Sequence, residues 1–351
     1  GARSFGFERI SQRLQQKAHE TVMEINLSAL AHNFHHYRNQ LLPETKIMAM
    51  VKAFSYGSGG AEIASMLEFN RCDYLAVAYA DEGVELRKSG IRLPIMVMNP
   101  ERSSFDTMLR HQLEPEIYSF RLLEELISIL QHNGNPGIRI HLKIDTGMHR
   151  LGFLPNEVEQ LCGILKQHPE IKIASVFSHL AGSESTELDS FTKEQAHQFN
   201  LAAKQISEAI GYSPLKHLLN STGISRFPEL QFDMVRVGIG LYGIGTTPND
   251  KAALLPVNRL RTIISQIKKV GAHQTVGYGR KGKVEKDAVI ATLPIGYADG
   301  FSRALSNGRG EVIVHGKRAK VIGNVCMDMT MIDISTIPEA REGDEVIIFG
   351  A

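Results

Sequence analysis

Short apolar runs alternate with amphipathic stretches along most of the first two thirds of the chain. The apolar runs have the length and composition of strands that are covered on both faces, and the stretches between them space their apolar residues as helices do. The predicted strands span 47–51, 74–78, 94–98, 115–118, 138–144, 173–177, 217–220 and 234–237. Strands in this number, separated by helices, close a (β/α)8 barrel, so we predict an α/β fold with a TIM-type barrel.

The pattern changes after about residue 250. Short alternating segments separated by glycine turns replace the helical spacing, and they span 261–270, 288–294, 310–314, 320–324, 330–334 and 345–349. Such a series is typical of a small, mostly-β domain. We therefore expect three parts: residues 1–20 as a tail or linker, residues 21–250 as the barrel, and residues 251–351 as a C-terminal β domain.

The segment before the first barrel strand has its own signals. Residues 21–27 alternate like a strand, and Ser28 is placed to cap a helix over 29–40. Three histidines of that helix, at 32, 35 and 36, share one face. No carboxylate or cysteine stands beside them in the sequence, so we expect no metal site there.

Composition and charge exclude several classes of protein. The 351 residues include 39 Lys plus Arg and 38 Asp plus Glu, which gives no basic surface for nucleic acid. No apolar run approaches the roughly 18 residues that span a bilayer, so no membrane partner is expected. The three cysteines are far apart, which favours a reducing, cytoplasmic location over a disulfide framework.

Polar residues gather where the predicted barrel strands end, which is where barrel enzymes build their active sites. These residues are Lys52, Lys143, Asp145, Arg150, His179, Asn220, Ser221, Thr222, Arg236 and Gly238. The hydroxyls of Ser221 and Thr222, with the backbone N–H groups of Gly238 and Ile239, are the groups that a phosphate monoester needs. The sequence therefore predicts a phosphate-binding site at this end of the barrel.

The β domain has a polar cluster of its own. Tyr278, Tyr297 and the run Cys326-Met327-Asp328 each lie close to glycines in predicted turns. Tyrosine beside glycine is also ordinary loop composition, so this cluster alone leaves its function open.

Several of these motifs, in this order and spacing, resemble those of the alanine racemase family. They are Val51-Lys-Ala-Phe-Ser-Tyr-Gly, Lys143-Ile-Asp-Thr-Gly-Met-His-Arg-Leu-Gly, Val235-Arg-Val-Gly-Ile-Gly-Leu-Tyr-Gly, Pro294-Ile-Gly-Tyr-Ala-Asp-Gly and Cys326-Met-Asp. The resemblance runs from about residue 21 to the last residue. It implies a pyridoxal 5′-phosphate (PLP) enzyme, with an α/β barrel and a C-terminal β domain, that interconverts L- and D-alanine. The loop after the lysine departs from the usual family pattern, Ala-Asn-Ala-Tyr-Gly-His-Gly, and here reads Ala-Phe-Ser-Tyr-Gly-Ser-Gly.

The resemblance also implies roles for individual residues. Lys52 is expected to hold the cofactor covalently and to act as one catalytic base, and Tyr278 to act as the base on the opposite face. The other expected cofactor-binding residues are Tyr56, His179, Asn220, Ser221, Arg236, Gly238 and Ile239. Among these, Arg236 is expected at the pyridine nitrogen, where most PLP enzymes place a carboxylate.

Further roles concern the substrate and the assembly. Arg150 and the main chain of Met327 are expected to bind the carboxylate of alanine, and Tyr297 to narrow the entrance. Lys143 is a candidate for carbamylation, a modification that would position Arg150. The resemblance further implies a homodimer in which each β domain completes the active site of the other subunit.

Both ends of the chain suggest a larger parent protein. The first residues, Gly1-Ala-Arg-Ser-Phe-Gly-Phe-Glu-Arg-Ile, resemble the tail of UDP-N-acetylmuramoyl-tripeptide–D-alanyl-D-alanine ligase. We therefore expect a fused ligase domain upstream and a D-alanine supply for peptidoglycan. Family members continue past residue 351, so the β domain is expected to be incomplete.

Other functions remain open at this stage. A racemase of serine, lysine or another small amino acid would share these motifs. A decarboxylase of the same barrel class would place a carboxylate by the pyridine nitrogen, against which Arg236 argues. A non-catalytic PLP-binding protein would lack the β domain, and a silent interaction module would have no reason to keep Lys52 and Tyr278.

Overall fold

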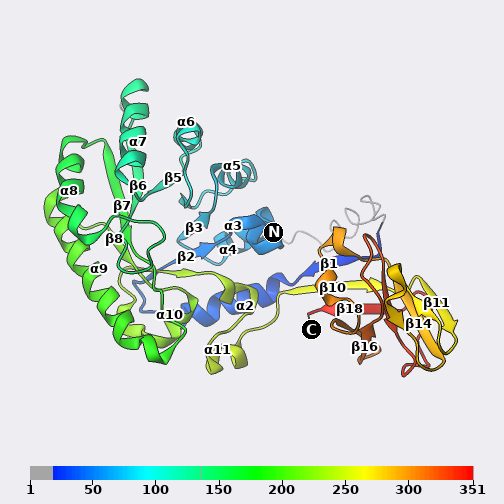
Figure 1. Cartoon of the computed structure of the whole chain (residues 1–351). Helices are drawn as coiled ribbons and strands as arrows, with labels where there is room; N and C mark the ends of the chain where they lie inside the picture. The colour runs from blue at the N-terminus through cyan, green and yellow to red at the C-terminus, as the bar shows by residue number, and fades with distance from the viewer. Residues whose placement is uncertain (1–18, 135, 351) are drawn as a thin grey trace, which may run out of the picture. The chain divides into compact units, whose positions relative to one another are not determined.

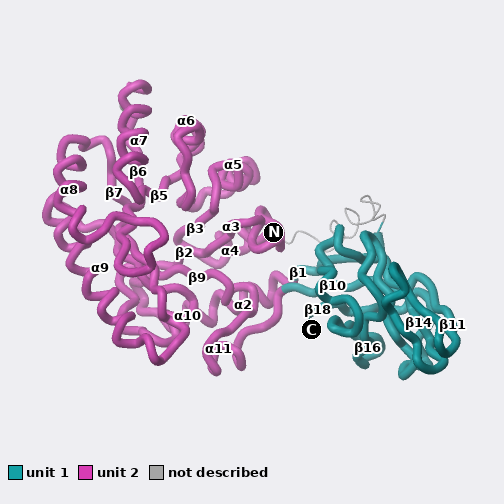
Figure 2. Tube along the Cα trace, in the orientation of Figure 1, with its two compact units in different colours: residues 1–25, 258–351 teal, residues 26–257 magenta. Residues whose placement is uncertain are grey.

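The computed structural model describes residues 19–134 and 136–350. These residues form two compact units, which we describe separately (Figure 2). One unit runs from Asn26 to Val257, and the other combines the residues up to Ile25 with those from Asn258 onward. The segment expected as a tail or linker, 1–20, lies outside the described residues except for its last two. None of the helices in the described residues combines the length and the hydrophobicity that a membrane span requires.

The first unit contains a closed barrel of parallel strands (Figure 1). The strands are β2 (Lys46–Met50), β3 (Tyr74–Val77), β4 (Ile95–Val97), β5 (Glu114–Ile117), β6 (Ile138–Lys143), β7 (Ile171–Phe177), β8 (Leu215–His217) and β9 (Met234–Val237). β2 pairs with both β3 and β9, which closes the ring. The predicted α/β barrel is thereby confirmed.

The seventh barrel strand differs from its prediction. β8 ends at His217, whereas the sequence pattern predicted a strand over 217–220. Asn220 instead caps a short helix, α10 (Ser221–Arg226), because its side-chain oxygen accepts a hydrogen bond from the Gly223 N–H at 2.8 Å. A similar shift occurs earlier, where Asn26 rather than Ser28 caps its helix.

Helices follow the barrel strands and surround the ring. They are α2 (Leu27–Arg38), α3 (Lys52–Gly57), α4 (Ala61–Phe69), α5 (Ala80–Lys88), α6 (Phe105–Arg110), α7 (Phe120–His132), α8 (Val158–Gln167), α9 (Asp189–Ile210), α10 and α11 (Pro248–Ala253). Short 3-10 turns join them: η1 (Arg102–Ser104), η2 (Pro155–Glu157), η3 (Thr186–Leu188), η4 (Pro228–Leu230) and η5 (Ile239–Tyr242). The described residues include no group of histidine, cysteine or carboxylate side chains that could hold a metal ion.

The interior of the barrel is divided between apolar and polar side chains. One cluster contains Met48, Met50, Tyr74, Ala76, Met96, Phe177 and Met234. The remaining inward positions of β5 to β9 include the buried polar residues Glu114, Glu116, His141, Lys143, Ser175, His217 and Arg236. Since successive strand residues point to opposite sides, polar residues two apart, such as Glu114 and Glu116, share the inner face. This polar half of the interior lies beneath the candidate site.

The second unit is an antiparallel β structure. Its eight-stranded sheet has the order β1-β10-β18-β15-β16-β17-β14-β11. These strands span β1 (Val22–Ile25), β10 (Asn258–Ile263), β11 (Gln266–Val270), β14 (Ala288–Leu293), β15 (Glu311–Val314), β16 (Lys317–Val321), β17 (Thr330–Asp333) and β18 (Glu345–Phe349), beside a hairpin of β12 (Thr275–Val276) and β13 (Gly282–Lys283). Three 3-10 turns complete it: η6 (Tyr278–Arg280), η7 (Tyr297–Asp299) and η8 (Arg303–Leu305).

The division between the units differs from the expected boundaries. β1 pairs with β10, and the Thr21 hydroxyl lies 2.8 Å from that of Thr262, so the start of the described chain belongs with the β unit rather than with the barrel. The barrel unit also extends to Val257 instead of ending at residue 250, because α11 packs into it: the Asp250 carboxylate accepts a hydrogen bond from the Ser225 hydroxyl.

Candidate active site

Lys52 stands at the mouth of the barrel, directly after β2 and Val51. The next four residues, Ala53 to Tyr56, all have left-handed backbone angles, with φ between 51° and 57°. None of them is glycine, and each such residue costs about 1–2 kcal/mol. Backbone strain of this kind is concentrated at functional sites, where the surrounding structure imposes it. The carboxylate of Glu82 accepts from the Phe54 N–H at 3.2 Å, which helps to hold the turn.

Tyr56, at the end of this turn, reaches the loop after β9. Its ring packs on that of Tyr242 with centroids 4.6 Å apart, and the Tyr242 hydroxyl donates to the Met50 carbonyl at 3.1 Å. A Cβ added to Gly238 would lie 3.1 Å from the Tyr56 hydroxyl oxygen. Glycine therefore leaves room for the phenol at this position. The Gly238 N–H donates to Ser221 Oγ at 3.0 Å, so three predicted phosphate-binding residues lie together.

Two neighbours of this group are engaged elsewhere. The Asn220 side chain caps α10 and also hydrogen-bonds to Ser183, at 3.0 Å through its amide nitrogen. Thr222 Oγ1 lies 2.7 Å from Thr246 Oγ1. Both residues thus support the loops around Ser221, while Ile239 remains 40% exposed at the start of η5.

Arg236 is a buried cation inside the barrel, held by β9. Its Nη1 lies 2.7 Å from His217 Nδ1, and its Nη2 donates to the carbonyls of Ser178 at 2.7 Å and Leu218 at 2.9 Å. Its Nε has no hydrogen-bond partner among the described residues, which leaves one N–H free for a ligand. Burial lowers the pKa of the guanidinium to about 10, so it stays charged at neutral pH.

The positive charges of four residues lower the pKa of the His179 imidazole. Its Nδ1 lies 3.3 Å from Arg236 Nη2. Burial, together with the positive charges of Arg236, Arg150, Lys143 and Lys52, lowers the pKa of the imidazole to about 3. The ring is therefore neutral at pH 7. All four cations therefore lie near this ring at one end of the barrel.

A chain of polar side chains runs from Arg236 across the barrel interior to Glu114. His217 Nε2 lies 2.7 Å from Ser175 Oγ, which lies 2.6 Å from His141 Nδ1, and His141 Nε2 lies 2.9 Å from a Glu114 carboxylate oxygen. Because the guanidinium can only donate, His217 accepts at Nδ1 and donates from Nε2 to Ser175, whose hydroxyl donates to His141 Nδ1. His217 is thereby fixed as the neutral tautomer that accepts from Arg236. His141 Nε2 and the facing Glu114 oxygen are at ion-pair distance, but neither makes a hydrogen bond with a described residue.

A second buried pair lies beside this chain. Lys143 Nζ is 3.1 Å from Glu116 Oε1, and both side chains are almost completely buried. Arg150 is exposed, after a loop that Asp145 fixes by accepting from the N–H groups of Gly147 and His149 at 2.9 and 3.0 Å. Asp145, one of the predicted strand-end polar residues, thus has a structural role in the turn.

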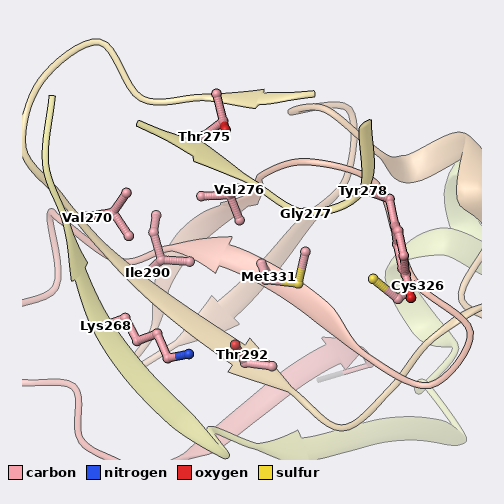
Figure 3. Close-up of a pocket in the computed structure, with 10 residues that line it drawn as sticks. All are labelled: Lys268, Val270, Thr275, Val276, Gly277, Tyr278, Ile290, Thr292, Cys326 and Met331. Atoms are coloured by element: carbon pink, nitrogen blue, oxygen red, sulfur yellow. The ribbon is translucent and has the colours of Figure 1, made fainter. Parts of the chain in front are cut away.

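The remaining predicted site residues lie in the β unit. Tyr278 is 72% exposed at the start of η6, and Tyr297 and Met327 are also exposed. The Tyr297 and Ala298 N–H groups donate to the carbonyls of Cys326 and Met327, at 3.0 and 2.9 Å, which joins the two segments. Figure 3 shows a pocket in this unit, lined largely by apolar side chains, with Tyr278 and Cys326 at the same end.

Sequence reasoning missed the polar residues of the barrel interior. These are Glu114, Glu116, His141, Ser175 and His217, together with Tyr242 in the loop after β9. A signal for them was present, since charged or polar residues recur at alternate positions of apolar strands, as in Glu114-Pro-Glu116 and His141-Leu-Lys143. Alternation of this kind places both members of a pair on one face of the strand.

The fold and the site define a class of enzyme: a (β/α)8 barrel with a lysine just past its first strand and a buried arginine on the neighbouring strand β9, accompanied by an antiparallel β unit. Comparison with known proteins gives the family. The family "Alanine racemase, N-terminal domain" matches residues 25–246, and "Alanine racemase, C-terminal domain" matches residues 257–351. The chain therefore belongs to the alanine racemase family, and its function is the interconversion of L- and D-alanine.

Individual relatives agree with this assignment. Alanine racemase of Sorangium cellulosum (strain So ce56) is 38% identical over 337 residues, which cover 94% of this chain and 88% of that protein. The structure of alanine racemase from Clostridium difficile 630 has a TM-score of 0.88 and 35% identity, and the match covers 95% of this chain and 87% of that one. The structure of alanine racemase from Bartonella henselae, described with covalently bound pyridoxal phosphate, has a TM-score of 0.85 and 26% identity, with 95% and 91% covered.

Proposed function

We propose that this racemase works by two-base proton transfer with PLP bound at the carboxyl ends of the barrel strands. The observation that carries the proposal is the convergence of Lys52, His179 and Arg236 at that end, beside the group formed by Tyr56, Ser221 and Gly238. When bound, PLP supplies an electron-withdrawing ring that acidifies the α-C–H of an attached amino acid. The protein must hold the ring, bind the substrate and exchange the proton.

The residues present fit this cofactor. The free Nε of Arg236 is a donor for the pyridine nitrogen, and the Tyr56 hydroxyl and Ser221 Oγ are donors for a phosphate. Because a guanidinium keeps its proton, Arg236 would donate a hydrogen bond to the ring nitrogen and would not protonate it. This would limit the electron withdrawal by the ring, which suits a reaction that must return the proton without side reactions. A carboxylate at this position would instead favour a protonated ring nitrogen, and this chain has Arg236 in its place.

Lys52 and Tyr278 are the two proposed bases. Lys52 serves as a base once its amine has lost its proton. A free phenol has a pKa of about 10, so Tyr278 needs a proton path or cationic help to act near pH 7. The neutral His179, held by the charged Arg236, is the group proposed to provide it. Arg150 and the Met327 main chain are proposed to bind the substrate carboxylate, and Tyr297 to narrow the entrance.

The proposal extends to the assembly and the cellular role. Tyr278, Tyr297 and Met327 are proposed to complete the site of a second subunit in a homodimer. From the sequence we infer a cytoplasmic enzyme that supplies D-alanine for peptidoglycan and has a ligase domain fused upstream. Reading the gene upstream of the codon for Gly1 tests the fusion, because a ligase reading frame in phase with this chain must be present there.

Reductive labelling tests the cofactor assignment. The purified protein is incubated with PLP, reduced with borohydride and digested, and the peptides are mapped. We expect an absorbance band at roughly 420 nm that disappears on reduction. We also expect the mapped peptides to carry a pyridoxyl group on Lys52. A Lys52→Arg variant should lose the label, whereas Lys46→Arg, at the other end of β2, should keep it. Labelling at another lysine, or no band after PLP is added, would exclude the proposed anchor.

A further inference from the structure

Gln195 is a buried amide on α9, and its side chain reaches the loop that carries His179. Its Oε1 accepts a hydrogen bond from the Ala181 N–H at 2.9 Å, and its Nε2 donates to the His179 carbonyl at 3.2 Å. Residues 178–185, between β7 and η3, belong to no helix or strand of the described chain. This stretch therefore depends on side-chain contacts to hold its backbone, and one side chain supplies two of them.

The same amide also reaches the loop after β6. Gln195 Nε2 lies 3.5 Å from Thr146 Oγ1, and that hydroxyl lies 2.8 Å from Ser178 Oγ. Phe191, four residues earlier and on the same face of α9, packs on this loop as well, since a Cβ added to Gly147 would lie 2.8 Å from Phe191 Cζ. One face of α9 thus joins the loops that follow β6 and β7.

The chemistry of a carboxamide matches this position. One planar group supplies the acceptor for the Ala181 N–H and the donors for the His179 carbonyl and the Thr146 hydroxyl. An ionised glutamate would lack the donors, and an apolar side chain would lack both. Among the described residues, every hydrogen bond of the Gln195 side chain goes to one of the two loops. Since burying an amide without partners is costly, these bonds account for a polar residue at this buried position.

The loop held by Gln195 places the His179 ring beside Arg236. Arg236 Nη2 donates to the Ser178 carbonyl at 2.7 Å and lies 3.3 Å from His179 Nδ1. The carbonyl and the ring that face the guanidinium belong to adjacent residues, and Gln195 binds the next carbonyl along the chain. A shift of this backbone would move the ring away from the cation. The low pKa of the imidazole, about 3, agrees with its present place beside Arg236 and the other cations.

We propose that Gln195 is a positioning residue that fixes the backbone at His179 and thereby keeps the imidazole ring beside Arg236. Its contacts are with the two loops, so it acts on the reaction only through His179. The effect on catalysis rests on the proposed role of His179 in helping Tyr278 to exchange a proton.

Titration of the His179 ring tests the positioning role without reference to catalysis. The PLP-loaded protein is prepared with 13C-labelled histidine, and the signal of His179, one of 14 histidines, is assigned by its absence from a His179→Gln spectrum. In the wild type this signal should not titrate between about pH 5 and pH 8. In Gln195→Met the midpoint should rise into this range, toward the ordinary value of about 6.5. A signal that stays untitrated in Gln195→Met would overturn the proposal.

Further variants separate positioning from packing. Methionine has nearly the length and volume of glutamine, so a space-filling role alone predicts no change in Gln195→Met. Gln198→Met is the matched control and should behave as the wild type, because the Gln198 amide lies on the same helix but donates to Glu194. If thermal unfolding shows that Gln195→Met does not fold, Thr146→Val takes its place, since it removes the hydroxyl between Gln195 and Ser178. The midpoint should rise there too, and an unchanged midpoint would overturn the proposal.

Racemisation kinetics connect the positioning role to the proposed function. Gln195→Met should lower kcat about tenfold with a smaller change in KM, because His179 is proposed to act while the proton is transferred. A midpoint that rises while kcat stays at the wild-type value would keep the positioning role and overturn the proposed role of His179. An unchanged midpoint in Gln195→Met, with a reduced kcat in His179→Gln, would overturn the role of Gln195 alone.

Discussion

Arg236 illustrates how a single residue is specified by its neighbours. A buried cation is costly unless its hydrogen bonds are satisfied, and here two carbonyls and a histidine nitrogen satisfy the terminal nitrogens. The same contacts orient the one remaining N–H. Sequence motifs gave the identity of this residue, but the free Nε follows only from the three-dimensional arrangement of its partners.

His179 gives a prediction at the same scale, in the pH dependence of stability. Its pKa is about 3 in the folded protein and about 6.5 in the unfolded chain, so the unfolded state binds more protons between these values. Stability is therefore lost as pH falls through 6.5. Between pH 7 and pH 5 this group should cost about 2 kcal/mol of unfolding free energy. A His179→Gln variant should not show this loss of stability between pH 7 and pH 5.

The measurement is urea denaturation of both proteins, free of cofactor, at pH 7 and at pH 5. His217 and the other titrating groups are common to the two proteins, so the difference between the two pH values isolates His179. Equal losses in the wild type and in His179→Gln would contradict the predicted depression of the pKa.

The strands and helices were largely predictable, and the reason is their periodicity. Apolar runs bounded by turns predicted the barrel strands, and the polar residues at their ends identified most of the candidate site. Among the inward polar residues, Lys143 and Arg236 were predicted, but Glu114 and Glu116 were not, because alternation shows that these two share a face but not which face is inside. That choice depends on partners such as His141 and Lys143, which come from a neighbouring strand.

We predict that breaking the chain of polar side chains between β5 and β9 lowers both the stability and the activity of the protein. Ser175→Ala removes the hydroxyl that joins His141 to His217 and leaves two buried ring nitrogens without partners. We expect a loss of about 1–3 kcal/mol in unfolding free energy. Since Arg236 loses its fixed acceptor tautomer, kcat should also fall.

Denaturation curves and racemisation rates measure these two effects. Ser89→Ala is the control, because it removes an exposed hydroxyl that donates to the Glu85 carbonyl. It should change stability by less than about 0.5 kcal/mol. A Ser175→Ala protein with wild-type stability and kcat would show that the chain does not act as a unit.

The left-handed turn after Lys52 makes a second prediction for a structural element. Glycine adopts this backbone conformation without steric cost, so Ala53→Gly should relieve strain and stabilise the protein by about 0.5–1 kcal/mol. Ala61→Gly, at the start of α4, should have the opposite sign and destabilise by up to about 1 kcal/mol. Thermal unfolding of both variants checks the pair. Destabilisation by Ala53→Gly would mean that the turn stores no such strain.

At the scale of the whole molecule, the proposed catalytic residues are divided between the two units. Lys52 belongs to the barrel unit and Tyr278 to the β unit, where it is largely exposed. An exposed catalytic base needs a partner surface that excludes water. We therefore expect Tyr278 to act on the barrel of a second copy of the chain, as the proposed dimer requires.

Mixed dimers test this expectation. Lys52→Ala and Tyr278→Phe variants should each be nearly inactive alone. After the two are unfolded together and refolded, half of the dimers should contain one chain of each kind. Each mixed dimer then has one site with both wild-type residues and one with neither, so about a quarter of the wild-type activity should return. Two batches of Lys52→Ala treated in the same way provide the control. Recovery no greater than in that control would show that Lys52 and Tyr278 of the same chain form the site.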